Sequence, residues 1–93
     1  MRYRIRYSEE ARRTLRKLPG RYRQRTRRLI ESLAKAPRPP GAKELRGLPG
    51  VYRIWINGWR LIFQVDDETE SVLIVGIRLK TGPETYDDLP IED

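Results

Sequence analysis

Hydrophobic and polar residues alternate most clearly in residues 51–65 of this chain, VYRIWINGWRLIFQV. Two alternating runs meet there at Asn57-Gly58, and an Asn-Gly pair between such runs is typical of a two-residue type I′ hairpin turn. The turn sets the register of the two strands, because it determines which residues lie opposite each other. The predicted cross-strand pairs are Ile56–Trp59, Trp55–Arg60, Ile54–Leu61, Arg53–Ile62 and Tyr52–Phe63.

The predicted hairpin has two unlike faces, because side chains alternate along each strand and cross-strand partners share a face. The face expected to form the core is wholly hydrophobic or aromatic and carries Tyr52, Ile54, Ile56, Trp59, Leu61, Phe63 and Val65. The opposite face carries Arg53, Trp55, Arg60, Ile62 and Gln64. Arg53 and Arg60 therefore flank Trp55 on a sheet face that we expect to be open.

The N-terminal half predicts one strand and two helices. Residues 2–7 alternate strictly and indicate a half-buried strand. Ser8 is then a candidate N-cap for a helix that stops at Pro19-Gly20. A second amphipathic helix is expected from about residue 21 to about residue 36. Residues 42–50 follow as an ordered loop, with leucines that we expect to anchor it to the core.

Residues 71–78 predict a third strand after the hairpin. Continued alternation places Leu73, Val75 and Ile77 on the core face, and Val72, Ile74, Gly76 and Arg78 on the open face. The element order β-α-α-β-β-β predicts an α+β fold, in which a two-helix hairpin packs on one face of an antiparallel sheet. The first strand is expected to pair with the last strand or to lie at a sheet edge, and residues 1–93 to form a single domain.

The composition excludes several kinds of chemistry. The chain has no cysteine and no histidine, which excludes disulfides, thiol nucleophiles, Ser-His triads and nearly every zinc site. We therefore expect neither a metal nor a cofactor, and any catalysis has to come from Tyr, Lys, Arg or carboxylates. No apolar run approaches membrane-spanning length, and the basic N-terminus lacks the apolar segment of a signal peptide. The sequence thus favours a cytoplasmic protein with no membrane partner.

The charge is unevenly distributed along the chain. The formal net charge is +7, from 20 Lys and Arg against 13 Asp and Glu. Residues 1–30 contain twelve basic and two acidic side chains, whereas residues 64–93 contain two basic and nine acidic ones. A polyanionic partner such as nucleic acid accounts best for this distribution. For the helix arginines taken alone, the alternative is a solvated surface on an Arg-rich protein.

Three arginines are expected to converge on the open sheet face from adjacent strands: Arg53, Arg60 and Arg78. Like charges in one patch repel each other, so a purely structural sheet rarely collects them without carboxylate partners. The functional interpretation is binding of a scissile phosphate or of a nucleic-acid backbone. In the structural alternative, Arg53 and Arg60 are solvated or pair with acids of the C-terminal tail, namely Glu84, Asp87 or Asp88.

Two neighbours of these arginines also have alternative interpretations. Trp55 can stack on a base, a contact worth roughly 1–3 kcal/mol in single-strand binders. It can equally cover apolar sheet surface together with Ile62. Gly76 has no side chain and leaves space for a ligand beside Arg78, or else marks a β-bulge.

Four motifs span nearly the whole chain: YSEEARRTLRKLP at the first helix, Leu33-x-x-x-Pro37, KELRGLPGVYRIWINGWRLIFQVDD, and VGIR followed by Tyr86. Together they resemble the RelE/ParE superfamily of bacterial type II toxins. The resemblance implies a small toxin that a cognate antitoxin neutralises. It favours the RelE-like branch, whose members are metal-independent endoribonucleases. These act on messenger RNA at the ribosome, through attack of a ribose 2′-hydroxyl on the adjacent phosphate.

The resemblance also implies roles for individual residues. Arg53, Arg60, Arg78 and Tyr86 occupy the positions of the catalytic residues in this branch. Tyr86 is then the candidate base, Arg78 and Arg60 stabilise the phosphorane, and Arg53 orients or protonates. The residues expected to contact RNA are Trp55, Lys80, Lys43 and Arg46.

Two positions depart from the RelE-like pattern and leave alternatives open. Trp55 stands where the nuclease has a Lys, which Lys80 would have to replace, and Phe63 stands where it has an aromatic hydroxyl. One alternative is a ParE-like protein that inhibits DNA gyrase without catalysis. The other is an inactive homologue that only binds nucleic acid.

Overall fold

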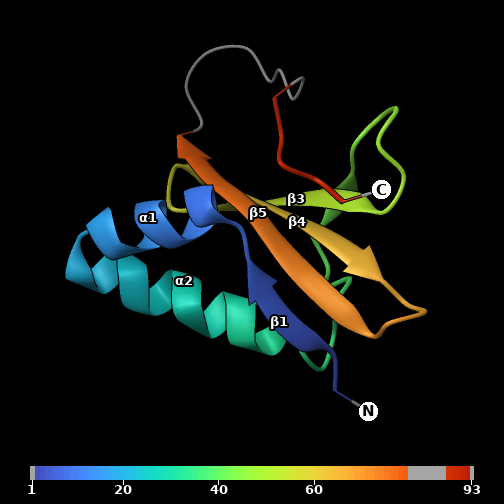
Figure 1. Ribbon diagram of the computed structural model, residues 1–93. Coiled ribbons are helices and arrows are strands. Elements are labelled where there is room, and N and C mark those ends of the chain that lie inside the picture. Colours follow the sequence, from blue (N-terminus) through green and yellow to red (C-terminus); the bar gives the residue numbers. More distant parts are fainter. Residues whose placement is uncertain (1, 80–87, 93) are drawn as a thin grey trace.

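The computed structural model describes residues 2–79 and 88–92 (Figure 1). Two helices and five strands follow one another in these residues. Their bounds are β1 (Arg4–Tyr7), α1 (Glu9–Lys17), α2 (Gly20–Ser32), β2 (Lys43–Glu44), β3 (Val51–Ile56), β4 (Trp59–Asp66) and β5 (Ser71–Leu79). Within this described part of the chain, no helix is long and apolar enough to cross a membrane.

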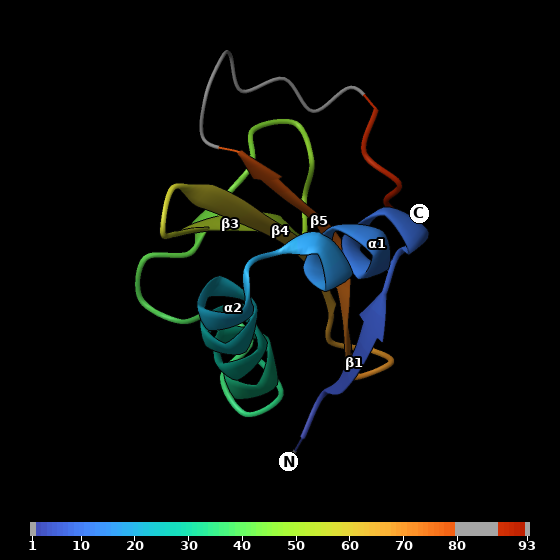
Figure 2. The same ribbon diagram turned by 90° about the vertical axis from the view of Figure 1, so that its left-hand side faces the viewer.

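The strands form one sheet in the order β1-β5-β4-β3-β2. Both helices cover the same face of this sheet (Figures 1 and 2), so the predicted α+β fold is confirmed. The sheet is mixed rather than antiparallel throughout, because β1 lies at an edge and runs parallel to β5. Such a parallel pair needs a long crossover connection, and the helices lie within it. The short strand β2 falls in the segment that was expected to be a loop.

Capping explains where the helices begin and end. The Ser8 hydroxyl accepts a hydrogen bond from the backbone N–H of Ala11 at 3.0 Å, as predicted for an N-cap. The helix α1 ends before Pro19, and α2 begins directly at Gly20. α2 ends at Ser32, four residues earlier than expected, and residues 33–35 form a turn. Pro37 contributes to this early end, because a proline disfavours helical backbone in the residue before it.

The hairpin of β3 and β4 has the predicted register at all five pairs. Its turn residues Asn57 and Gly58 have φ values of 50° and 79°. A type I′ turn requires positive φ at both positions, which is why Asn-Gly is favoured there. The hairpin therefore follows directly from its local sequence.

A β-bulge in β5 overturns the predicted phase of that strand. Ile62 pairs with Gly76 but Phe63 pairs with Ile74, so Val75 is an extra residue in β5. The bulge reverses the alternation before it. Val72 and Ile74 lie in the core beneath the helices, while Leu73 and Val75 lie on the opposite face, contrary to prediction. After the bulge the prediction is right, since Ile77 belongs to the core beneath the helices.

Two hydrophobic clusters lie on the two sides of the sheet. The larger, beneath the helices, contains Ala11, Leu15, Leu18, Ile30, Leu33, Leu61, Phe63, Val65, Val72, Ile74 and Ile77. The smaller lies on the face away from the helices, called here the far face, and contains Val51, Ile62, Leu73 and Val75. Leu45 and Leu48 of the loop, with Leu89 and Ile91, cover the smaller cluster. The far face is thus only partly open.

Candidate functional site

The strand register brings the predicted arginines together on the far face. One cross-strand row contains Trp55, Arg60 and Arg78, from β3, β4 and β5. The adjacent row begins with Lys43 and Arg53, followed by Ile62 and Gly76. Because cross-strand partners share a face, the cationic side chains of these rows lie side by side. We call the set Lys43, Arg53, Trp55, Arg60 and Arg78 the basic patch.

Arg60 lies at the middle of the basic patch and is 5% exposed. Its Nη2 donates a hydrogen bond of 2.6 Å to the backbone carbonyl of Leu79. A guanidinium group is costly to bury, because the charge loses its hydration. Its burial between Trp59 and Leu61 is therefore a feature that packing alone does not require.

Arg78 is held by two carboxylates. Its Nε and Nη2 donate to the two carboxylate oxygens of Glu10, each at 2.9 Å, and its Nη1 donates to Asp88 at 3.0 Å. The hydrogen bonds to Glu10, with those to Asp88, hold the pKa of Arg78 above its usual range. Arg78 in turn lowers the pKa of Asp88. The tail acid Asp88 thus pairs with Arg78, whereas Glu84 and Asp87, the other two acids named in the structural alternative, fall outside the described residues.

Glu10 is a site residue that the sequence did not reveal. In the first turn of a helix, an acidic residue is ordinarily explained by the helix dipole. One signal was available in retrospect. Relative to the N-cap Ser8, the residue that closes a capping box is the third helical residue, Ala11. Glu10 is the second, so its carboxylate is available for a distant partner.

The space beside Gly76 is already filled. A β-carbon at Gly76 would lie 2.6 Å from Oε2 of Glu10. The space that we expected for a ligand next to Arg78 is therefore occupied by the Glu10 carboxylate. The bulge offered as the alternative is present, although its extra residue is the preceding Val75.

Trp55 is an exposed residue of the basic patch. Its side chain is 43% exposed, and the guanidinium group of Arg53 lies over the indole, 4.8 Å from the ring centroid. Ile62, its proposed companion in covering the sheet, is fully buried in the smaller cluster. Stacking of Trp55 on a base stays a prediction.

The remaining predicted residues lie at the edge of the basic patch, outside it, or outside the described residues. Lys43 is exposed on the edge strand β2, and Arg46 is exposed in the loop that follows. Arg46 lies outside the two cross-strand rows. Tyr86 and Lys80 fall outside the described residues.

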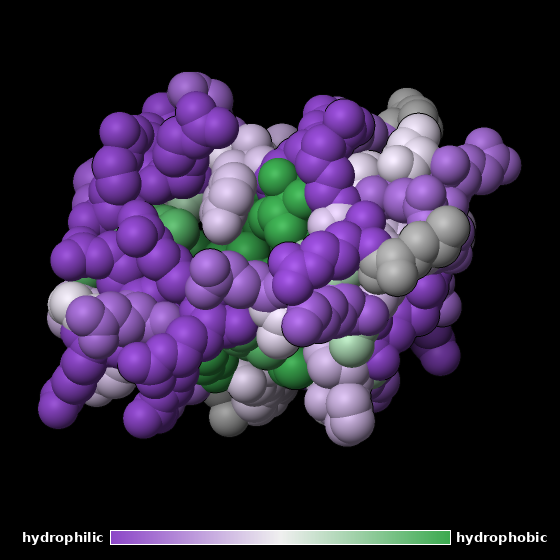
Figure 3. Space-filling view, turned by 90° about the horizontal axis from the view of Figure 1, so that it is seen from below, coloured by the Kyte–Doolittle hydropathy of each residue, from purple (hydrophilic) through white to green (hydrophobic). Residues whose placement is uncertain are grey.

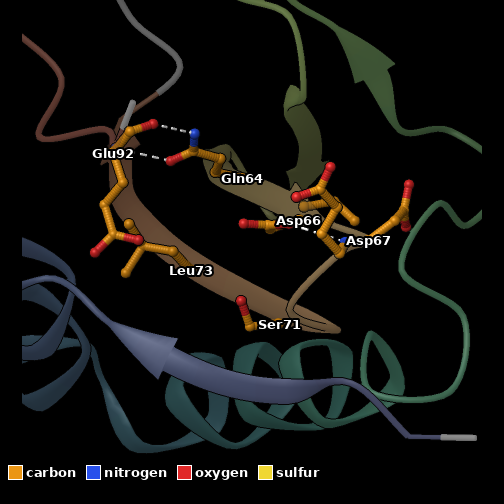
Figure 4. A pocket seen from close by; sticks show the side chains of 8 residues that line it. Gln64, Asp66, Asp67, Ser71, Leu73 and Glu92 are labelled. Atoms are coloured by element: carbon orange, nitrogen blue, oxygen red, sulfur yellow. Dashed lines mark hydrogen bonds between the residues drawn. The ribbon is translucent and has the colours of Figure 1, made fainter.

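Residues 88–92, called here the C-terminal strap, lie over the far face. Asp88 binds Arg78 at one end, and Glu92 binds Arg6 of β1 at the other, at 2.6 Å. Figure 4 shows the Gln64 carboxamide joined to Glu92 by two hydrogen bonds. The strap thereby connects β5 with β1, its neighbour in the sheet.

The hollow in Figure 4 is not a phosphate site. It has a volume of about 330 Å³ and is lined by Gln64, Val65, Asp66, Asp67, Glu68, Ser71, Leu73 and Glu92. Its carboxylates repel anions, and the residues of the basic patch do not line it. Across the described residues, no group of three or more acidic side chains is placed to hold a metal ion.

A second basic region lies on the helices. α2 exposes Arg21, Arg25, Arg27 and Arg28, and hydrophilic side chains dominate the face seen from below in Figure 3. Nη1 of Arg25 donates to Oδ1 of Asn57 at 2.8 Å, which ties α2 to the hairpin turn. These charges add a positive field outside the basic patch, as expected for a protein that binds a polyanion.

Comparison with known proteins agrees with this geometry. The family model described as the ParE toxin of type II toxin–antitoxin system, parDE, matches residues 5–80. The chain is 30% identical over 90 residues to the mRNA interferase toxin RelE of Escherichia coli strain K12, covering 95% of this chain and 94% of that protein.

Solved structures share the fold. The isolated Escherichia coli RelE toxin superposes with a TM-score of 0.76, at 30% identity over 88% of each chain. The toxin–antitoxin complex RelBE2 of Mycobacterium tuberculosis gives a TM-score of 0.73 at 30% identity, covering 85% of this chain and 99% of that one.

Proposed function

The chain belongs to the RelE/ParE superfamily and is a toxin of the type II toxin–antitoxin class, and we propose that it cleaves messenger RNA on the ribosome. The observation that carries this proposal is the basic patch, in which Arg60 and Arg78 lie directly opposite each other with Trp55 in the same row. A protein that only blocks a partner enzyme does not need this concentration of guanidinium groups on a sheet. The RelE relative named above is an mRNA interferase.

The proposed reaction is a transesterification within the RNA. The ribose 2′-oxygen attacks the adjacent phosphorus, the bond to the 5′-oxygen breaks, and a cyclic phosphate forms. Arg78 and Arg60 stabilise the charge that develops on the phosphorane, and Arg53 orients the phosphate or protonates the leaving oxygen. Tyr86 is proposed as the base from its sequence position alone.

The partners follow from the same proposal. The Mycobacterium tuberculosis relative was solved as a toxin–antitoxin complex, and we propose that a cognate antitoxin neutralises this chain as well. The ribosome and its messenger RNA are the proposed targets, with Trp55 stacking on a base. Lys43 and Arg46 lie toward the edge strand β2, where they would contact the RNA backbone.

One observation favours a second function. The matching family model is described as a ParE toxin, which supports the alternative of a DNA gyrase inhibitor without catalysis. In that case messenger RNA stays intact, and stalled gyrase complexes accumulate on DNA.

Mapping of messenger-RNA ends on ribosomes after induced expression tests the proposal. We expect new 5′ ends with wild-type protein and none with Arg78→Ala. Arg13→Ala is the matched control, because it removes an exposed arginine from α1, outside the basic patch. Intact messenger RNA together with gyrase trapped on DNA would overturn the proposal.

A further inference from the structure

The start of α1 is attached to the bulge of β5. The backbone N–H of Ser8 donates to the carbonyl of Ile74 at 2.9 Å, and the Ser8 hydroxyl donates to the carbonyl of Val75 at 2.6 Å. The same hydroxyl caps α1 by accepting from Ala11. One side chain therefore fixes the helix start against the bulge. Glu10, two residues further along, is thereby placed over β5 near Gly76.

Gly76 is a glycine for reasons of space and not of backbone conformation. Among residues 2–79 and 88–92, the glycines with positive φ are Gly41, Gly47, Gly50 and Gly58, and Gly76 is not one of them. A β-carbon at Gly76 would approach Oε2 of Glu10 to 2.6 Å and Cδ to 3.5 Å. Any larger residue must displace the Glu10 carboxylate. The absent side chain thus allows the contact between Glu10 and Arg78.

The contact itself has a defined geometry. Nε of Arg78 donates to Oε2 of Glu10, and Nη2 of Arg78 donates to Oε1. Such a bidentate pair fixes both the position and the plane of the guanidinium group. The side chains of Arg78 and Glu10 are 24% and 32% exposed. The opposite edge of the guanidinium group, with Nη1, faces Asp88, whose side chain is 78% exposed.

We propose that Glu10 is a positioning residue, which orients Arg78 toward the scissile phosphate, and that Gly76 is kept small to admit its carboxylate. This inference rests on the function proposed above. Asp88 has a different part, because it makes one exposed contact at Nη1, and exposed ion pairs contribute little free energy. The substrate phosphate displaces Asp88, while Glu10 stays in place and holds the guanidinium plane.

Single-turnover cleavage of messenger RNA on programmed ribosomes tests the positioning role. We expect Glu10→Ala to lower kcat on the order of 100-fold, as a misplacement of about 1 Å in a catalytic group does, with KM little changed. In an Arg78→Ala background the same substitution causes no further loss, because there is no guanidinium left to orient. Glu9→Ala is the matched control, since it removes a neighbouring exposed carboxylate from the same helical turn.

The resonance of the Arg78 Nε–H group tests the space argument without any RNA. Gly76→Ala displaces the Glu10 carboxylate and so moves this resonance in the wild-type background, whereas most of that shift disappears in a Glu10→Ala background, where the clash is gone. Equal shifts in both backgrounds would overturn the account of Gly76. In the same samples, the Arg78 Nε–H resonance should move on Glu10→Ala and stay in place on Glu9→Ala.

Failure of the proposed function and failure of the positioning role give different results. Wild-type protein that cleaves no messenger RNA overturns the proposed function, and the positioning role with it. Wild-type cleavage that Glu10→Ala and Glu10→Gln both leave at full kcat overturns the positioning role alone.

Discussion

The two faces of this sheet differ in what they contain. Beneath the helices, Leu61 and Phe63 are fully buried among other apolar side chains. On the far face, the same strand β4 carries the buried Arg60, next to an exposed Trp55. Under the proposed function, the helix-covered side of β4 stabilises the fold, while Arg60 on its other side acts on RNA. Substitutions beneath the helices should therefore unfold the protein, whereas those in the basic patch should inactivate a folded one.

The largest effect is expected on the helix-covered face. Phe63→Ala removes a fully buried ring that stacks on Tyr52, with ring centroids 5.8 Å apart. We expect it to lower the free energy of unfolding by about 3–5 kcal/mol, measured by urea denaturation. Trp55→Ala on the far face should cost about 1 kcal/mol or less. Similar losses for the two substitutions would abolish the distinction between the faces.

The next effect should appear in activity and not in folding. Arg78→Ala removes a guanidinium group proposed to stabilise the phosphorane, so we expect kcat to fall about 10²–10³-fold. The side chain left behind, Glu10, is partly exposed and can be hydrated. The urea midpoint should therefore stay close to that of Arg13→Ala. A fall in kcat that merely follows a fall in stability would contradict the assignment.

A smaller effect should separate two exposed apolar residues, Trp55 on the far face and Leu79, which pairs with Trp59 on the opposite face. Trp55→Ala removes the stacking surface and should weaken binding of single-stranded RNA by roughly 1–3 kcal/mol, as measured by fluorescence anisotropy. Leu79→Ala is the matched control, because Leu79 is 53% exposed and the substitution keeps the carbonyl that Arg60 binds. Equal losses would show that general apolar contact, and not stacking, holds the RNA.

The smallest effect concerns the C-terminal strap and pH. Hydrogen bonds from Arg78 and Arg6 lower the pKa values of Asp88 and Glu92. Because the folded-state pKa of each carboxyl group is lowered, each contact stabilises the strap above about pH 4, the ordinary carboxyl range. This stabilisation is lost as the pH falls further and the carboxylates become protonated. The Gln64 side-chain amide resonance should report the release. Glu92→Gln should weaken its pH dependence, and an unchanged titration would contradict the role of the strap.

The hairpin and the cluster of arginines could be predicted because local chemistry determines them. Asn57-Gly58 specifies the turn, and the turn specifies which side chains share a face. The phase of β5 could not be predicted in the same way. Both faces of that strand are buried near Val75, so its apolar run has no alternation that would reveal a bulge.

Glu10 was missed for a different physical reason. Its contact with Arg78 depends on how α1 docks against β5, through the bonds that Ser8 makes at the bulge. Such tertiary contacts leave no periodic pattern in a sequence. The parallel direction of β1 is likewise a consequence of chain topology. The alternation of its residues indicated a half-buried strand, but it could not indicate the direction of that strand relative to β5.

Photocrosslinking on programmed ribosomes tests most directly whether the far face is the one that meets messenger RNA. A benzophenone amino acid is placed at Trp55 in the basic patch or at Gln24, an exposed position on α2. We predict crosslinks to the messenger RNA from position 55 and none from position 24. Crosslinks to messenger RNA from position 24 alone would contradict the assignment of the RNA site to the far face.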